Sequence, residues 1–512
     1  MSDVVQHPVT PVRPTVEAPG AYPLGVSRPP LEVADLPTPE EVYDVPRFGR
    51  REAFRFAVGP SLIGLGAAIG SGEWILGPLT IGKQGFLGIG WLIVVAVVLQ
   101  CLANFEIGRY ITATGESPIV GFSRVPPGRR VWVPLCLFTL FGCFLLGGWA
   151  KASAKSLFAL LEGRPAVLGD SFTVNVMTFL LLGSVVLITL AFRRITRGLE
   201  LVNGVLIALE VGFLLLVCVF TVPWAAWWDG IEGFIRPAIP PDGTSATDIG
   251  AVMGFAGLTA GVNWAFFAHY RDKGYGMGHR VGFLAGGRGE QKRLRPTGFA
   301  FPDDDINTGR WRQWMRLLRL DMYGVFLPGA IIGMLLPTVL VRHLAVESGT
   351  APSGANIETF AASLLGAEHG RWLFYATLLV GFLIIFDTLI GILEILVRNA
   401  TDAVTTSPQL EEVVARDPRR FYFPTMVAMI VVIGTITTIT QPATLVQWSA
   451  NLTNAGALVF PFALIYLNTR LPKAARPPRY AIAALLANVV FFGFFFVNFV
   501  VEKVSGSPLV TF

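Results

Sequence analysis

Long apolar stretches separated by short polar linkers recur along most of the chain. A membrane-spanning helix needs about 20 predominantly apolar residues. Eleven stretches of roughly that length lie at residues 57–80, 86–110, 131–160, 172–192, 200–223, 250–271, 319–341, 372–398, 422–440, 446–468 and 480–501. The pattern predicts an all-α integral membrane protein with about eleven transmembrane helices.

Basic residues concentrate in alternate linkers, which follow the second, fourth, sixth, eighth and tenth stretches. The opposite linkers are poor in lysine and arginine, and the segment from Trp224 to Asp248 contains only Arg236. Cytoplasmic linkers are enriched in these residues. We therefore expect a multi-pass protein of the cell membrane with a cytoplasmic N-terminus and, since the number of spans is odd, a C-terminus outside.

The composition supports this prediction. Of 512 residues, 53% are hydrophobic and 15% are charged, whereas soluble domains carry about 25% charge. The basic residues behind the net charge of +5 are spread over the linkers. Their distribution therefore indicates the topology of a protein surrounded by membrane lipid, and we expect no nucleic acid as a partner. Residues 1–50 are polar and rich in proline, which is typical of a disordered tail, here cytoplasmic; residues 51–512 form the predicted transmembrane domain.

Two of the spans contain residues that should interrupt a helix. The first span contains Gly70, Ser71 and Gly72, and the sixth contains Gly257 and Gly261. Glycine is a poor helix former, and unwound backbone in a membrane must line a cavity or be buried in protein. Matched breaks five spans apart favour an inverted repeat with a binding site between its halves, here 57–223 and 250–468, followed by an extra helix at 480–501. The alternative is that the glycines only allow close helix packing.

Charged side chains within membrane spans are costly and are therefore functional candidates. The spans contain Glu73, Lys151, Lys155, Glu210, Asp387 and Glu394. Glu73 is the strongest candidate because it directly follows the break in the first span. For Asp387, a role with a proton or ion and a role in helix pairing are equally favoured.

Several short segments occur in an order known from one family of transporters. They are Gly59-Pro60 through Trp74, Gln100, Thr114-Gly115, Arg197-Gly198-Leu199-Glu200, Trp372-Leu373-Phe374 and Phe460-Pro461-Phe462. Across about residues 55–500 the chain resembles the Nramp family of proton-coupled divalent metal transporters. The resemblance implies the leucine-transporter-like inverted repeat of five plus five helices, a transported metal cation and protons as the coupling ion.

The chain departs from the family at the metal-binding motifs. Gly70 and Glu73 stand where the Asp-Pro-Gly-Asn motif of the first helix has its ligands. The nearest match to Met-Pro-His-Asn of the sixth helix is Gly261-Val262-Asn263-Trp264, which has no thioether. Carboxylate and carbonyl oxygens suit hard ions such as Mg²⁺. In the third helix, Gly148 and Lys151 stand where the family has an Asp and a Glu tied to proton movement, so a base replaces an acid. We hypothesise that Lys151 pairs with Glu73.

These observations favour a secondary active transporter of Nramp-like fold that moves a divalent metal cation by alternating access. We expect the substrate to be bound by residues at the two breaks, with Glu73 as the metal ligand, a cavity shaped by two tryptophans, and two charged side chains acting on protons or as counter-ions. These residues are Gly70, Ser71, Glu73, Thr259, Ala260, Gly261 and Asn263 for the substrate, Trp74 and Trp264 for the cavity, and Lys151 and Asp387 for the protons or counter-charge. No cofactor is expected.

Two other classes remain open. One is a transporter of a small organic solute such as an amino acid, and the other is a non-transporting membrane sensor that kept the fold. The chain lacks a Walker-type glycine loop and a pattern of nucleophile and base, so an enzyme is not expected. A cavity with one carboxylate and several carbonyls would favour transport of a cation. A wide cavity lined by Trp74 and Trp264 would favour transport of an organic solute, and a collapsed cavity would favour the sensor.

Overall fold

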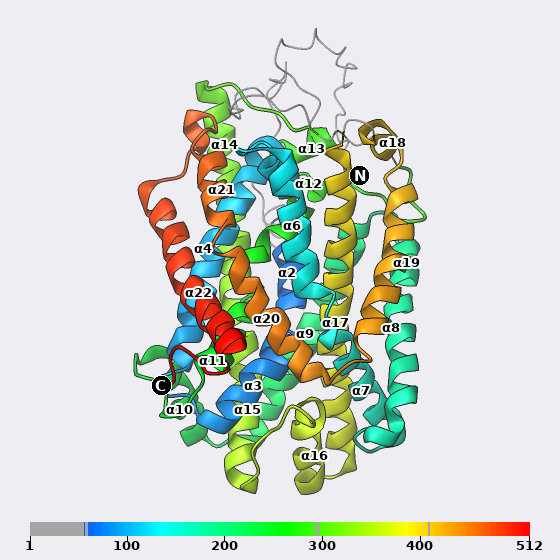
Figure 1. Ribbon diagram of the computed structural model, residues 1–512, viewed down its shortest axis with the longest axis vertical. Coiled ribbons are helices and arrows are strands. Elements are labelled where there is room, and N and C mark those ends of the chain that lie inside the picture. Colours follow the sequence, from blue (N-terminus) through cyan, green and yellow to red (C-terminus); the bar gives the residue numbers. More distant parts are fainter. Residues whose placement is uncertain (1–55, 57–59, 292–294, 296, 408–409) are drawn as a thin grey trace, which may run out of the picture.

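The computed structural model describes residues 56, 60–291, 295, 297–407 and 410–512. Across these residues the regular structure is helical, apart from two isolated β-bridges. The helices run roughly along the long axis of the molecule (Figure 1). The tail predicted at residues 1–50 lies outside the described residues.

Ten helices in the described part of the chain are long and apolar enough to cross a membrane. They are built from α2 (Pro60–Ala68), η2 (Ser71–Leu76) and α3 (Gly77–Gln84); α4 (Gly90–Thr114); α6 (Arg129–Phe144) and α7 (Gly148–Glu162); η3 (Leu168–Asp170) and α8 (Ser171–Ala191); α9 (Ile195–Thr221); α14 (Asp305–Arg319), η5 (Leu320–Phe326) and α15 (Leu327–Ser348); α17 (Arg371–Thr405); α19 (Arg419–Ile436); α20 (Pro442–Gly456) and α21 (Phe460–Asn468); and α22 (Arg479–Ser505). Each contains one of the predicted apolar stretches or most of it.

The remaining predicted span, the sixth, is broken into three short pieces. These are α11 (Ala246–Phe255), η4 (Ala260–Ala265) and α12 (His269–Lys273). None of them alone is long enough to cross a bilayer, since a spanning helix needs about 20 residues. Together they complete the eleven predicted spans and confirm the predicted all-helical membrane fold.

Short helices in the linkers mark the two ends of the bundle. At the upper end of Figure 1 lie α12, at the end of the sixth span, and the linker helices α13 (Gly278–Val281) and α18 (Glu411–Arg416), which follow the sixth and eighth spans. At the lower end lie α10 (Trp224–Ile235), α16 (Ile357–His369) and the C-terminus. The helices α10 and α16 were not predicted. The alternation of the linkers between the two ends agrees with the pattern of basic residues.

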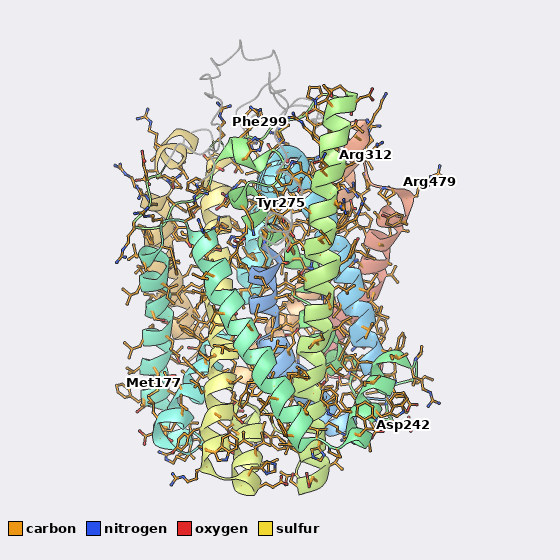
Figure 2. All side chains as sticks on the ribbon, turned by 180° about the vertical axis from the view of Figure 1, so that it is seen from behind. Met177, Asp242, Tyr275, Phe299, Arg312 and Arg479 are labelled. Atoms are coloured by element: carbon orange, nitrogen blue, oxygen red, sulfur yellow. The ribbon has the colours of Figure 1, made fainter. Side chains whose placement is uncertain are left out.

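The linker between the sixth and seventh spans is partly buried. Phe299, Ala300 and Phe301 are buried, and the Phe299 amide donates to the Thr114 carbonyl at 2.7 Å. Figure 2 shows Tyr275 and Phe299 at the same end of the bundle as Arg312. The apolar residues of this linker therefore cover the ends of the helices. The Asp304 side chain caps α14 by accepting from the Asn307 amide at 2.7 Å.

The helices around the first span differ in how much of their surface faces outward. Side chains of α17 are buried along most of its length, whereas most of those on α9 face outward. The buried face of α9 includes Asn203, Glu210, Leu214 and Val217, which follow the spacing of one helical stripe. Because α2 packs against both α9 and α17, the buried face of α9, with its polar residues Asn203 and Glu210, lies beside the first span.

Candidate functional site

The first span is interrupted directly before Glu73. Between α2 and η2 the backbone of Gly70 has φ −161° and ψ −121°, and its amide donates to Glu73 Oε2 at 3.4 Å. A Cβ atom on Gly70 would lie 1.5 Å from Thr388 Oγ1, so only glycine fits here. Glu73 is fully buried, and its Oε1 has no hydrogen-bond partner among the described residues. The break therefore presents a carboxylate oxygen with free capacity.

The sixth span is interrupted between α11 and η4. Gly257 has φ +88° and Ala260 has φ +31°, and both values lie in the left-handed region that interrupts a right-handed helix. A helix break leaves backbone amides and carbonyls without their usual partners, and lipid cannot supply them. The polar groups at this break must therefore be satisfied by side chains.

Gln100 of α4 supplies those partners. Its Nε2 donates to the carbonyls of Ala256 and Met253 at 2.6 and 3.2 Å. Its Oε1 accepts from the amides of Thr259 and Ala260, both at 3.1 Å. One buried amide side chain thus bridges both sides of the break. The sequence shows Gln100 as a polar residue in an apolar span and as part of the family resemblance, neither of which reveals this role.

Asn263 contributes to the same network from inside η4. Its Oδ1 accepts from the amide and the hydroxyl of Thr259 at 2.9 and 3.0 Å, and its Nδ2 donates to Gln100 Oε1 at 3.3 Å. The side chain proposed from sequence to bind substrate is thus engaged in holding the break. Any role with a substrate would require it to exchange these partners.

The two breaks meet at the centre of the bundle. A Cβ atom on Gly72 would lie 2.9 Å from the Phe255 Cβ, and the Gly257 amide faces the Glu73 carboxylate. Between the breaks lies a cavity of about 10 Å³, lined by Ala67, Ala68, Ser71, Gly72, Phe144, Phe255, Leu258, Thr259 and Ile392. A single water requires about 10–15 Å³, so the cavity has room for one water or one bare ion.

A second small cavity lies on the other side of the sixth-span break. Its volume is about 30 Å³, and its lining includes Ala260, Gly261, Asn263 and Trp264 together with side chains of α4, α21 and α22. Gly261 is required here because its Cβ would lie 1.8 Å from the Ala457 amide nitrogen. The residues predicted at the sixth-span break are therefore divided between two cavities.

Trp74 lines neither of these cavities. Its ring packs against Gly381 of α17, where an added Cβ would lie 2.9 Å from Trp74 Cζ2. Trp264 instead packs within an aromatic cluster, with its ring centroid 5.2 Å from that of Phe460 and the two rings tilted by 57°. The wide cavity lined by both tryptophans that the sequence left open does not form in this structure.

Lys151 does not pair with Glu73 as hypothesised. Its Nζ donates to the carbonyls of Thr437 and Thr440 at 2.7 and 3.3 Å, at the end of α19. The last carbonyls of a helix lack partners within the helix, and a lysine is well suited to bind them. The half-buried position of Lys151 on α7 places its ammonium group there, whereas Glu73 is fully buried.

A buried network of charges joins α12 to α17. Arg398 donates to Glu394 Oε1 at 2.7 Å and also pairs with Asp272, and His269 Nε2 lies 3.0 Å from Glu394 Oε2. Burial opposes ionisation of Asp272, but Arg398 and Arg271 outweigh it and hold its pKa at about 2. Glu394 is therefore part of a structural network, which the sequence did not predict.

Asp387 lies two helical turns before Glu394 on α17, beside Gly66 of α2 and Asn203 of α9. When the Asn203 amide is oriented to satisfy both neighbours, its nitrogen donates to Asp387 Oδ1 at 3.1 Å and to the Leu199 carbonyl at 2.9 Å. A Cβ atom on Gly66 would lie 2.4 Å from Asp387 Oδ2. Glu210 lies seven residues after Asn203 on the same buried face of α9, which packs against α17. The sequence singled out both acids but not the packing of their helices.

The metal-binding capacity of these groups is limited. Within the described ranges, no group of three or more histidine, cysteine, aspartate and glutamate side chains is placed to hold a metal ion. Glu73 follows directly after Ser71 and Gly72 but is not itself among the residues that line the cavity between the breaks.

These features define a multi-pass helical membrane protein in which two broken helices, the first and the sixth spans, meet at the centre. The same architecture is found in solved structures of a manganese transporter from Eremococcus coleocola. Its complex with an aromatic bis-isothiourea substituted compound is 13% identical to this chain, covers 92% of each chain and has a TM-score of 0.60. A mutant of that transporter, also 13% identical, covers 93% of this chain and 92% of its own, with a TM-score of 0.55.

This similarity confirms the Nramp-like fold and its leucine-transporter-like arrangement. At 13% identity it concerns the fold alone, because one fold can host different functions. No protein-family model matches the chain, and no curated protein sequence does.

Proposed function

We propose that this protein is a secondary active transporter that moves a divalent metal cation by alternating access, with Glu73 as its charged ligand. The observation that carries the proposal is the free Oε1 of Glu73, fully buried at the break of the first span. An ionised carboxylate with one oxygen unsatisfied and no opposite charge beside it is costly in such a place. A cation bound there would remove that cost.

The groups around Glu73 can complete a cation site. Ser71 and Thr259 line the small cavity between the breaks. The Gly70 carbonyl accepts one hydrogen bond, from the Trp74 amide at 2.7 Å, and a carbonyl oxygen has two lone pairs. One carboxylate with hydroxyl and carbonyl oxygens is a ligand set for a hard ion such as Mg²⁺. Support for a hard ion also comes from the lack of a thioether at Gly261-Val262-Asn263.

The size of the cavity favours an ion over an organic solute. Sites for small molecules are about 300–1,000 Å³, whereas the cavity between the breaks is about 10 Å³. An amino acid would require the helices to separate, while a bare ion would not. The buried carboxylate also weighs against a sensor that has lost its site.

The remaining parts of the proposal concern topology and coupling. We place the upper end of Figure 1, which carries the basic linkers, in the cytoplasm. The N-terminus then lies inside, and the C-terminus outside. The spans at 57–223 and 250–468 form the two repeats, and 480–501 the extra helix. The Nramp-like fold makes protons the natural coupling ion.

The proposal is tested by uptake into proteoliposomes of the full-length protein. Mg²⁺, Mn²⁺ and Ca²⁺ are offered in one series, and a panel of amino acids in the other. We expect uptake of at least one divalent ion by the wild type and its loss in Glu73→Gln, because the amide cannot supply the negative charge. Unchanged uptake by this variant would refute the role of Glu73.

Glu358→Gln is the matched control. Glu358 of α16 is also buried, but it pairs with Lys155 at 3.0 Å and does not line the cavity between the breaks. This variant should take up cations like the wild type. Uptake of an amino acid without any divalent ion would favour the organic-solute transporter instead.

A further inference from the structure

A cavity much larger than the two at the helix breaks lies at the lower end of the bundle in Figure 1. Its volume is about 530 Å³, and it is bounded by the end of the first span, by α10 and by the last turns of α15. Binding sites for small molecules have volumes of about 300–1,000 Å³. The cavity shares no lining residue with the small cavity between the breaks. It therefore has the size of a ligand site and is separate from the site proposed around Glu73.

Close helix contacts fix the walls of this cavity. A Cβ atom on Gly233 of α10 would lie 2.4 Å from the Phe86 Cβ, and one on Gly230 would lie 2.6 Å from Val339 Cγ2 of α15. The two glycines thus allow α10 to lie directly against the end of the first span and against α15. Since ligand sites are usually largely pre-formed, this close packing favours a permanent pocket.

The outward face of α10 indicates the level at which the cavity lies. Trp224, Trp228 and Ile235 are 73%, 56% and 73% exposed, and their spacing of four and seven residues puts them on one side of the helix. Tryptophan is enriched where a membrane meets water, and an amphipathic helix with an exposed aromatic face is typical of that boundary. The helix α10 also directly follows α9, most of whose side chains face outward. The cavity beside α10 therefore lies at the level of the lipid headgroups.

The charged side chains of α10 lie on a neighbouring side of the helix and line the cavity. Asp229, Glu232 and Arg236 are spaced by three and four residues, and all three are lining residues. Arg236 donates to Glu232 Oε1 at 2.7 Å. For Asp229, which is exposed, no ion pair is found in the part of the chain that the structure describes. The cavity therefore offers a carboxylate without a fixed partner on its α10 side.

On the α15 side, the cavity is lined by Arg342 and His343. His343 pairs with Glu347 at 3.1 Å. Arg342 is half-buried, and its Nη1 donates to the Gly82 carbonyl in the last turn of α3 at 3.0 Å. That bond uses one of the five N–H donors of a guanidinium group, and no acid is found paired with Arg342 among the described residues. A half-buried guanidinium with unused donors and no counter-charge is suited to bind an anion.

We propose that this cavity binds the headgroup of a phospholipid that carries a primary ammonium group, such as an ethanolamine phospholipid. Arg342 binds the phosphate, because a guanidinium group matches the geometry of phosphate oxygens. Asp229 accepts hydrogen bonds from the ammonium group, with Glu232 beside it. The glycerol and acyl chains of the lipid leave past Leu87 and Val346, which line the cavity and are 51% and 63% exposed.

The chemistry of the lining selects among phospholipid headgroups. A primary ammonium group has N–H donors for carboxylates, whereas a quaternary ammonium such as choline is recognised by a cage of aromatic rings. Among the described residues that line the cavity, Phe86 is the only one with a phenyl or indole ring, and it is buried against Gly233. A headgroup with a phosphate and no ammonium would leave the negative charge of Asp229 uncompensated beside it. The cavity therefore favours ethanolamine over choline and glycerol headgroups.

The position of the cavity gives the bound lipid an effect on stability. The helix α3 follows directly after η2, which carries Glu73, and the bond from Arg342 to Gly82 already joins α3 to α15. A headgroup that contacts both α10 and α15 would stabilise this arrangement, since a ligand that binds only the folded state stabilises that state. Lipid binding does not require that the protein transports a metal cation, so it can be tested apart from the proposed function.

Lipid binding is measured by native mass spectrometry of the full-length protein, supplied in detergent with equal amounts of phospholipids that have ethanolamine, choline and glycerol headgroups. We expect the wild type to retain the ethanolamine phospholipid in preference to the other two. In R342Q its apparent affinity should fall about tenfold, because a hydrogen bond to a charged group contributes on that order. In D229N the phosphate contact remains, so binding should persist while the preference for ethanolamine over glycerol headgroups is lost. Equal retention of the three lipids by the wild type would overturn the proposal.

R129Q is the matched control. Arg129 is also half-buried, and its Nε donates to the neutral Thr406 Oγ1 at 3.1 Å, at the other end of the bundle. This variant should bind the ethanolamine phospholipid as the wild type does, whereas equal affinities of R342Q and the wild type would refute the role of Arg342. If R342Q does not fold, D229N on the exposed surface of α10 still decides, because a wild-type preference for ethanolamine in that variant would overturn the proposal.

A soluble headgroup distinguishes a lipid site from a site for a free zwitterion. Lipid-depleted protein is supplied either with the ethanolamine phospholipid in mixed micelles or with soluble glycerophosphoethanolamine, and its unfolding temperature is recorded. We expect the phospholipid to raise the unfolding temperature of the wild type and R129Q but not of R342Q, and the soluble compound to have a much smaller effect. An equal rise with the soluble compound would assign the cavity to a soluble zwitterion and overturn the lipid proposal.

Discussion

Replacing Gln100 with leucine tests whether the break in the sixth span is held by one side chain. Leucine has a similar size, but it removes five hydrogen bonds of 2.6–3.3 Å. The Thr259 amide would keep Asn263 Oδ1 as its acceptor. The Ala260 amide and the Ala256 carbonyl would lose the bonds that Gln100 makes to them. A buried polar group left unpaired costs about 1–3 kcal/mol, so the variant should be destabilised by about 2–6 kcal/mol.

The same helix offers a matched control. Asn104 lies one turn later on α4, is fully buried, and its amide has no hydrogen-bond partner among the described residues. Asn104→Leu therefore removes a buried polar group without breaking a bond and should leave stability unchanged or raise it. Both variants are compared by thermal unfolding of the purified protein in detergent, followed by tryptophan fluorescence. Equal unfolding temperatures for Gln100→Leu and Asn104→Leu would refute the role of Gln100.

Two further predictions address backbone packing and charge. Gly261→Ala should prevent the native fold, because its Cβ would lie 1.8 Å from the Ala457 amide nitrogen. Gly183→Ala on α8, where an added Cβ would meet no atom within 4 Å, should be neutral or stabilising by about 0.5–1 kcal/mol. Size-exclusion profiles and unfolding temperatures distinguish the two variants, and a normal profile for Gly261→Ala would contradict the close packing. The pKa of Asp272 is about 2 in the folded protein, below its ordinary value of 3.8, so this carboxylate stabilises the fold above that ordinary value and the stabilisation is lost as the pH falls toward 2. Asp272→Asn should therefore show a smaller decline in unfolding temperature on acidification than the wild type, and an equal decline would count against the network.

The sequence predicted the spans because their signal is local. Twenty apolar residues in a row define a membrane helix whatever surrounds them, and Gly70 and Gly257 indicated the two breaks because glycine itself weakens a helix. The tenth span is also interrupted, between α20 and α21, and Gly456 and Pro461 could have indicated this. These features depend on the residue and its immediate neighbours.

The partners of the charged residues were not predictable in the same way. Lys151 lies in an apolar stretch, but its ammonium reaches the carbonyl of Thr437, 286 residues later. Whether a buried charge is structural or free depends on which distant helix end lies beside it. Glu394 and Glu210 are both single acids within apolar spans. Only the fold shows that Arg398 pairs with the first and that neither carboxylate oxygen of the second has a hydrogen-bond partner among the described residues.

The two breaks differ in how many of their polar groups already have partners within the protein, and this difference indicates which break could bind a ligand. At the sixth span, Gln100 and Asn263 engage the exposed amides of Thr259 and Ala260. At the first span, the Gly70 amide is met by Glu73 at the long distance of 3.4 Å, and Glu73 Oε1 is left without a partner in the described chain.

A ligand at the centre would therefore gain most from the first span, because its polar groups are the ones not already satisfied by protein. The sixth span would act mainly as the opposing wall, since a ligand that took over its groups would first have to displace Gln100 or Asn263. This asymmetry fits a small cation held chiefly by Glu73. It also explains why Asn263, which the sequence placed among the ligands, contributes to the site by fixing the backbone against which the cation would be bound.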